Sequence, residues 1–509
     1  MASVGEGLDR PLAGGDASLD EMPPSSAKSF FGSGAVYAST MAVQRAVSFL
    51  LLPIFTHILL PSQYGELSIA LAANAVATVI FAFGLELAIF RGLVHLADDR
   101  DARNRFVRSI WTFLLIAPLL AGVAVTLLMA PFLSTSSVLG VGELCLAMLA
   151  ASLYVSATTL PLALLRVDRR LHDFIVVNTV ATVTTVGLEL LLVVVFRAGV
   201  TGWLVALCLG SATTLVVAMV VVPYRRPRPF DRAIVRDTLR QSIPVMPHFA
   251  AMWSLQLADR VLLAALVTTA SVGVYSLASN MATPLLVLVI GVNQAFMPAY
   301  AQAGKPNSTT NLQSLIELQV AVIAMLSLAC ALLAPVVINV FVDAHYRAAS
   351  GLTSWIVLGY VFVGLYSIPM NGVTLTYGRS QRIWVVSIAA AVVNLGLIYA
   401  LVPHDGLEAA AVASAAGYGA LLAGVFLYSV WTGTMISYPW WTIGAVFIVG
   451  ALVYAGGMFT VGANDVRDIA LRLVWIFIAA GVMAVIVNRQ RFILLWGQKS
   501  ARRADSGGL

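Results

Sequence analysis

Long apolar stretches follow one another along almost the whole chain, with only short polar segments between them. A helix needs about 20 apolar residues to cross the hydrocarbon core of a bilayer. We expect fourteen such spans, at 33–59, 64–90, 106–131, 140–165, 174–196, 201–223, 243–268, 272–298, 313–341, 351–376, 383–402, 407–431, 438–460 and 469–488. Because the chain is 60% hydrophobic and only 11% charged, a water-soluble fold could not bury this surface. The sequence predicts an all-α polytopic membrane protein.

The charges in the connecting segments predict the orientation. If the N-terminus is cytoplasmic, 24 of the 30 Lys and Arg residues fall in cytoplasmic segments, as the positive-inside rule requires. We therefore expect a protein of the cell (inner) membrane with both termini in the cytoplasm. Residues 1–28 hold no apolar run and predict a disordered tail, and residues 489–509 predict a basic tail. The outer loops leave no room for a catalytic domain, so we expect no enzyme.

The chain repeats itself at an offset of 207 or 208 residues. Gly65 recurs as Gly273, and Pro161 recurs as Pro369. The offset covers an even number of spans, so the two copies share one orientation, and sites in such folds lie between the repeats. We expect an N-terminal six-helix lobe at 29–240, a C-terminal six-helix lobe at 241–432, and two additional membrane helices within 433–488.

Two arginines lie inside apolar spans, where a charge costs about 2.5–3.5 kcal/mol. Arg45, beside Gln44 on a polar stripe, lies in the first span, and Arg260 lies in the equivalent seventh span. Facing each other, they would form a cationic cavity for a phosphate or pyrophosphate, which guanidinium binds bidentately. The alternative is a buried ion pair that locks a lobe, for example Arg45 with Glu86. Asp259 precedes Arg260 by one residue, so their side chains should point about 100° apart and not share a partner.

The remaining candidates are ionisable or polar residues of the second and seventh spans. Gln256 is expected to line the cavity, and Arg91 at the cytoplasmic mouth serves either orientation or capture of anionic headgroups. Glu86, Asp259 and His248 are candidates for ion coupling, although a satisfied core histidine is the plainer interpretation of His248. Glu86 also falls on a four-residue series with two polar residues of its span, Asn74 and Thr78.

The sequence lacks several motifs, and their absence argues against the corresponding functions. The three cysteines, Cys145, Cys208 and Cys330, lie in apolar spans without metal-ligand spacing, and we expect no metal and no cofactor. The sequence holds no P-loop motif, so transport would depend on a gradient. The basic residues fall in short loops between spans, which argues against nucleic-acid binding.

Six short blocks together resemble the polysaccharide-exporter (Wzx-type) flippases of the MOP superfamily, which also includes MATE exporters and lipid II flippases. The blocks are Leu51–Gly65, Phe83–Arg91, Ser242–Pro244 leading to Asp259–Arg260, Val272–Ala278, Ala295–Tyr300 and Asn394–Ala410. The resemblance implies two six-helix lobes in a V-shaped, MATE-like fold and alternating access. It also implies a cargo, a polyprenyl-pyrophosphate-linked oligosaccharide passed from the cytoplasmic to the outer leaflet.

Two other functions compete with this interpretation. A MATE-like, ion-coupled exporter of small molecules is kept open by Glu86 and Asp259, whereas the arginines argue against a cation site. A membrane glycosyltransferase or glycan polymerase would need a sizeable outer loop, which the chain lacks. For a flippase, the partners would be the lipid-linked glycan and the bilayer, with a polysaccharide polymerase and glycosyltransferases as candidate protein partners.

Overall fold

The computed structural model describes residues 47, 49–96, 99–133, 139–222, 231–304, 311–379, 382–459 and 466–506, and every regular element within them is a helix. The α-helices are α2 (Pro61–Phe81), α3 (Leu85–His95), α4 (Arg100–Leu133), α5 (Val141–Val167), α6 (Leu171–Glu189), α7 (Gly199–Val221), α8 (Arg232–Ser242), α9 (Met246–Trp253), α10 (Asp259–Leu266), α11 (Thr269–Ala303), α12 (Leu312–Phe341), α13 (Ala349–Asn371), α14 (Ile383–Trp431), α15 (Trp440–Phe459) and α16 (Val466–Ser506). Short π-helical turns are η2 (Leu190–Val195), η4 (Ser254–Ala258) and η6 (Gly372–Thr376), and 3-10 turns are η3 (Ile243–Val245) and η5 (Ala344–Tyr346).

The membrane spans agree with the expected ones. Twelve helical segments of the described chain are long and apolar enough to cross a membrane. One of them, α14, holds two expected spans, because Gly406 (φ 69°, ψ −149°) interrupts its helical backbone. Only the end of the first expected span, 33–59, falls within the described residues, where it forms the apolar helix Phe49–Ile58. The chain is thus an all-helical, multi-pass membrane protein.

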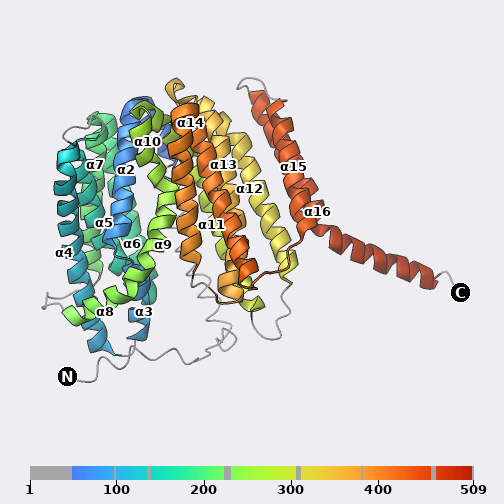
Figure 1. Ribbon diagram of the computed structural model, residues 1–509, viewed down its shortest axis with the longest axis horizontal. Helices are drawn as coiled ribbons and strands as arrows, with labels where there is room; N and C mark the ends of the chain where they lie inside the picture. Colours follow the sequence, from blue (N-terminus) through green and yellow to red (C-terminus); the bar gives the residue numbers. More distant parts are fainter. Residues whose placement is uncertain are drawn as a thin grey trace.

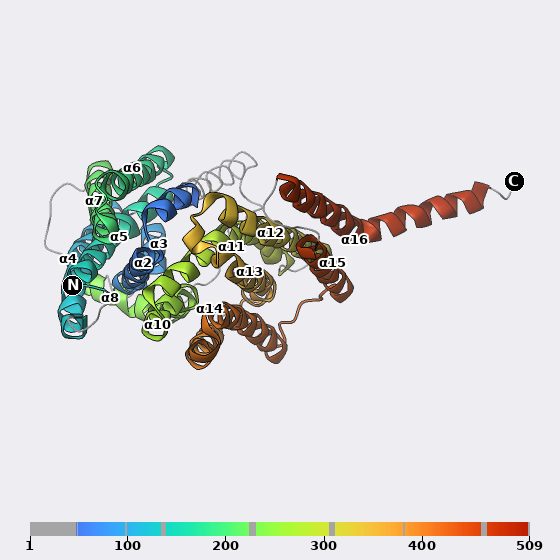
Figure 2. The same cartoon turned by 90° about the horizontal axis from the view of Figure 1, so that it is seen from above.

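The helices run roughly parallel to one another and form neighbouring groups (Figures 1 and 2). Helices α2 to α7 lie at one side of the molecule, and α9 to α14 lie beside them. Helices α15 and α16 pack on each other and on α12, so the two additional helices are attached to one edge of the second group. The far end of α16 runs away from the bundle (Figure 1).

The second span, expected at 64–90, lies within the candidate span Pro61–His95, but the helix is interrupted in its course. Helix α2 ends at Phe81, and both Phe83 (φ 51°) and Gly84 (φ 65°) adopt left-handed backbone before α3 begins. A Cβ atom at Gly84 would lie 2.9 Å from the carbonyl oxygen of Ser242, so the end of α8 packs directly against the break. Glu86 therefore does not continue the polar series of α2.

The repeated glycines meet. A Cβ atom at Gly65 in α2 would overlap the carbonyl oxygen of Thr269 and lie 3.1 Å from the backbone nitrogen of Gly273 in α11. A Cβ atom at Gly273 would in turn overlap the carbonyl oxygen of Pro61 and lie 3.0 Å from the nitrogen of Gly65. Only glycine permits this approach of two backbones. The reciprocal contact is what a two-fold relation between the repeats would produce.

Candidate functional site

A buried polar cluster surrounds the start of α10. Asp259 and Arg260 are only 4% and 7% exposed. The hydroxyl of Tyr275 in α11 donates a hydrogen bond of 2.6 Å to the Asp259 carboxylate, and lies 2.8 Å from the hydroxyl of Ser414 in α14. The cluster thus joins three helices through groups that replace the water a carboxylate would otherwise require.

Arg260 is held by the π-helical turn that precedes it. A π-turn leaves carbonyl groups without their usual helical partners. In η4, the guanidinium of Arg260 donates to the carbonyl of Gln256 (2.9 Å), and the hydroxyl of Tyr418 donates to the carbonyl of Leu255 (3.0 Å). The Gln256 side chain is half-buried, and the expected contribution of that side chain to a cavity stays a prediction.

Asp259 and Arg260, which were expected not to share a partner, contact each other. Their closest side-chain atoms, Nη1 and Oδ1, are 3.8 Å apart. The reason is that the long arginine side chain folds back along the helix toward Gln256, which overrides the rotation of about 100° between neighbouring residues. In this conformation the arginine therefore takes part in a buried ion pair, and its role in binding an anion stays a prediction.

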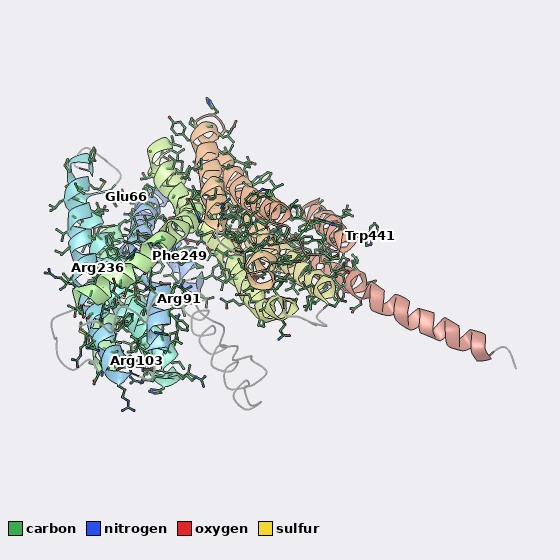
Figure 3. All side chains as sticks on the ribbon, turned by 60° about the horizontal axis from the view of Figure 1, so that its bottom comes forward. Glu66, Arg91, Arg103, Arg236, Phe249 and Trp441 are labelled. Atoms are coloured by element: carbon green, nitrogen blue, oxygen red, sulfur yellow. The ribbon has the colours of Figure 1, made fainter. Side chains whose placement is uncertain are left out.

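Glu86 and Arg91 lie apart from this cluster on α3. Both side chains are exposed, and Glu86 stands in the first turn of its helix, where a carboxylate is favoured by the helix dipole. Within the described chain, no hydrogen bond or ion pair joins either residue to Asp259 or Arg260. Figure 3 shows Arg91 on α3 and Arg236 on α8 in the same group of helices, and α3 contacts α8.

Three of the predicted site residues cannot be placed. Gln44 and Arg45 lie outside the described residues, as does the side chain of His248 in α9. Tyr275, Ser414 and Tyr418 were not among the predicted site residues. Tyr275 could have been found from the sequence, because it lies in a run of small residues in α11, where a buried hydroxyl needs a polar partner.

A second polar cluster lies at the end of the bundle opposite the basic loops. We call it the outer latch, after the orientation expected from the sequence. It consists of Leu59, Tyr64, Asn280 and Tyr346. The Tyr346 hydroxyl donates to the carbonyl of Leu59 (2.8 Å), and the Asn280 amide donates to the Tyr64 hydroxyl (2.7 Å). The rings of Tyr64 and Tyr346 meet edge to face at 5.9 Å. Together with the glycine contact, the latch joins residues before 240 to residues after 240.

The loop that carries Tyr346 is itself fixed by an acidic cap. The Asp343 carboxylate accepts a hydrogen bond of 2.9 Å from the backbone N–H of His345. This hydrogen bond and the contact with the His345 ring hold the pKa of Asp343 below its usual range. Burial raises the pKa of Tyr346, so its hydroxyl remains protonated and keeps donating to Leu59.

No group of His, Cys, Asp or Glu side chains within the described ranges has the arrangement of a metal site.

The fold is similar to that of solved transporters. A lipid II flippase, MurJ, in an inward closed conformation superposes with a TM-score of 0.64 at 12% identity, over 88% of this chain and all of that one. A eukaryotic MATE transporter gives 0.56 at 15% identity over 79% and 95%, and an inward-facing multidrug resistance MATE transporter of the MOP superfamily gives 0.52 at 15% over 76% and 98%. These likenesses show a MurJ/MATE-like fold, as the resemblance implied.

Comparison at the level of sequence identifies the family. A search of curated protein sequences finds no significant match. A family model described as "Polysaccharide biosynthesis protein" matches residues 32–304, which is more than half of the chain. The chain therefore belongs to the polysaccharide biosynthesis protein family, and its fold is similar to that of MurJ and MATE transporters.

Proposed function

We propose that the protein is a flippase that moves a polyprenyl-pyrophosphate-linked oligosaccharide from the cytoplasmic to the outer leaflet for cell-surface polysaccharide biosynthesis. Membership of the polysaccharide biosynthesis family is the observation that carries this proposal. The transporter fold supports movement of a substrate over its chemical conversion. Glycosyltransferases would then complete the cargo before the flipping step, and a polymerase would use it afterwards.

Transport proceeds by alternating access of two lobes, residues 29–240 and 241–432, with both chain termini in the cytoplasm. The outer latch and the contact between Gly65 and Gly273 support a conformation that is closed toward the outside. Cargo enters from the cytoplasmic side in this state. Release to the outer leaflet requires these contacts to separate.

The pyrophosphate is bound by cationic and polar side chains, namely Gln44, Arg45, Arg91, Gln256 and Arg260. Arg260 is engaged by Asp259 and by the carbonyl of Gln256 in the closed conformation, so α10 rearranges before the guanidinium binds an anion. Asp259, Glu86 and His248 are the residues through which ion binding is coupled to this rearrangement. Protonation of Asp259 would release Arg260, because the ion pair would lose its negative partner.

Deletion of the gene followed by analysis of membrane lipids tests the function. A strain without the flippase accumulates a lipid-linked oligosaccharide that is accessible only from the cytoplasmic face, and the intact gene reverses this. An unchanged lipid pool in the deletion strain would contradict the proposal.

An ion-coupled exporter of small molecules is the second candidate, and the buried carboxylate of Asp259 is the feature that favours it. In that case the deletion strain would become sensitive to toxic compounds and its lipid-linked oligosaccharides would remain normal. The same strain therefore separates the two functions.

A further inference from the structure

Helix α8 has two distinct faces although it is only eleven residues long. Arg232, Arg236 and Arg240 recur every four residues on one face, and Val235 and Leu239 recur on another, followed by Ile243. In the sequence these arginines look only like basic residues of a connecting segment, which help to set the membrane orientation. Their spacing is that of an amphipathic helix.

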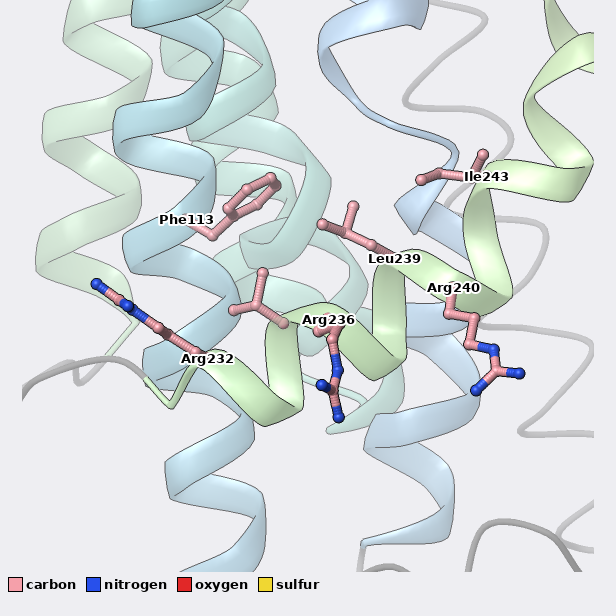
Figure 4. A pocket seen from close by; sticks show the side chains of 7 residues that line it. Phe113, Arg232, Arg236, Leu239, Arg240 and Ile243 are labelled. Atoms are coloured by element: carbon pink, nitrogen blue, oxygen red, sulfur yellow. The ribbon is translucent and has the colours of Figure 1, made fainter.

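The position of α8 is fixed at its start. The Asp231 carboxylate accepts a hydrogen bond of 2.9 Å from the backbone N–H of Ala233, which caps the helix. The backbone N–H of Asp231 donates to the hydroxyl of Ser109 in α4 (3.0 Å). The helix then crosses the bundle from α4 toward α3 (Figures 1 and 4). It therefore lies across the ends of the membrane helices, on the side of the basic loops.

A cavity of about 600 Å³ opens beside α8. Its lining is almost entirely apolar and consists of Phe113 from α4 with Val235, Leu239 and Ile243, together with the apolar parts of the three arginine side chains. In Figure 4 the Arg236 and Arg240 side chains point downward, the Leu239 and Ile243 side chains point upward, and the Arg232 side chain points to the left, away from the other two arginines. Ile243 is 54% exposed. An exposed isoleucine beside arginines is typical of the boundary between hydrocarbon and headgroups.

The charge around the cavity is positive. Asp237 lies 3.5 Å from Arg236, but both side chains are exposed, and such a pair contributes little. The Asp231 carboxylate is engaged in the helix cap. On the neighbouring α3, the positive charge of Arg91 offsets the negative charge of Glu86. The three arginines of α8 thus remain available to an anion.

We propose that the cavity beside α8 binds an anionic phospholipid of the cytoplasmic leaflet. The phosphate contacts Arg236 and Arg240, and the start of an acyl chain lies against Phe113, Leu239 and Ile243. A phospholipid fits better than a soluble anion because the lining of the cavity is almost entirely apolar, with the guanidinium groups at its edge. The inference does not depend on the cargo, and it gives α8 a fixed place in the headgroup layer.

Native mass spectrometry of the purified full chain tests this, with phosphatidylglycerol and phosphatidylcholine added separately. The variant Arg236→Gln/Arg240→Gln should bind phosphatidylglycerol about thirtyfold more weakly, given the usual contribution of an arginine near an anionic surface. The matched control is Arg197→Gln/Arg347→Gln, which removes two exposed arginines from other loops and should leave the affinity unchanged. Equal losses in both variants would overturn the proposal.

Two further measurements identify the occupant. Ile243→Ser should also weaken phosphatidylglycerol binding, whereas unchanged binding in this variant would contradict an acyl chain in the cavity. Inorganic pyrophosphate at millimolar concentration should not displace phosphatidylglycerol from the wild-type chain. Efficient displacement would assign the cavity to the pyrophosphate of the cargo and so overturn the phospholipid proposal. Monodisperse elution of each variant excludes misfolding as the cause.

Discussion

Replacement of Gly65 by alanine should disturb the contact between the two repeats without changing any charge. The new methyl group would lie 2.8 Å from the carbonyl carbon of Thr269 and would overlap its oxygen. Helices α2 and α11 would have to separate locally by about 1 Å, and overpacking of this kind costs about 1–3 kcal/mol.

In the proposed alternating-access cycle, that cost applies only to the conformation in which the outer end is closed. In the conformation with an open outer end, α2 and α11 would no longer touch at this point. A free-energy difference of about 1–3 kcal/mol changes the ratio of two conformations by about 5–150-fold. Gly65→Ala should therefore favour the conformation with a separated outer end. It should also slow flipping, because each cycle must return to the closed state.

Spin labels at His57 and Arg347 would measure this change by double electron–electron resonance, after the three cysteines are replaced. Both positions are exposed, and they flank the outer latch. We expect a longer distance in Gly65→Ala than in the parent. The control is Gly291→Ala, because a Cβ atom at Gly291 in the same α11 meets nothing within 4 Å. Identical distance distributions in Gly65→Ala and in the control would refute the reasoning.

Three further predictions follow from the polar contacts. Tyr275→Phe removes a hydrogen bond to a buried carboxylate and should lower the free energy of unfolding by about 1.5–3 kcal/mol. The effect is measured as thermal stability in detergent, and the control Tyr366→Phe, at another buried tyrosine, should have a smaller effect. Arg260→Ala leaves an unpaired buried carboxylate, which costs about 3–5 kcal/mol, and should abolish flipping in proteoliposomes; wild-type rates would remove Arg260 from the site. The Asp343 cap has a lowered pKa, so its stabilising effect is present above the ordinary value of 3.8 and is lost as the pH falls further. The protection factor of the His345 N–H against hydrogen exchange should fall in that range, and Asp343→Asn should remove this pH dependence.

The approximate positions of the described spans could be predicted because a long apolar run is the main requirement for a membrane helix. The family and the transporter fold followed from short blocks whose order and spacing are specific. The matching glycines 65 and 273 were visible as a repeat, although their mutual contact was not, since a repeat does not state which surfaces meet.

The features that escaped prediction depend on tertiary packing. The break after α2 places Phe83 in left-handed backbone, which no residue pattern announces, because phenylalanine normally avoids that conformation. The contact between Tyr275 and Ser414 joins residues 139 positions apart. Helix α8 was hidden because eleven residues with three arginines have the composition of a basic loop, and only the four-residue spacing distinguishes them.

The π-helical turn at Ser254–Ala258 fixes the angular register between α9 and α10. Such a turn adds about one residue to a helix, so its removal rotates one side against the other by about 100°. Deletion of a single residue there would keep α10 on α14 and turn α9 to a different neighbour. The same rotation occurs without any deletion if the turn migrates along the helix. The seventh span can therefore change the face it presents while its two ends stay at the same depth in the membrane.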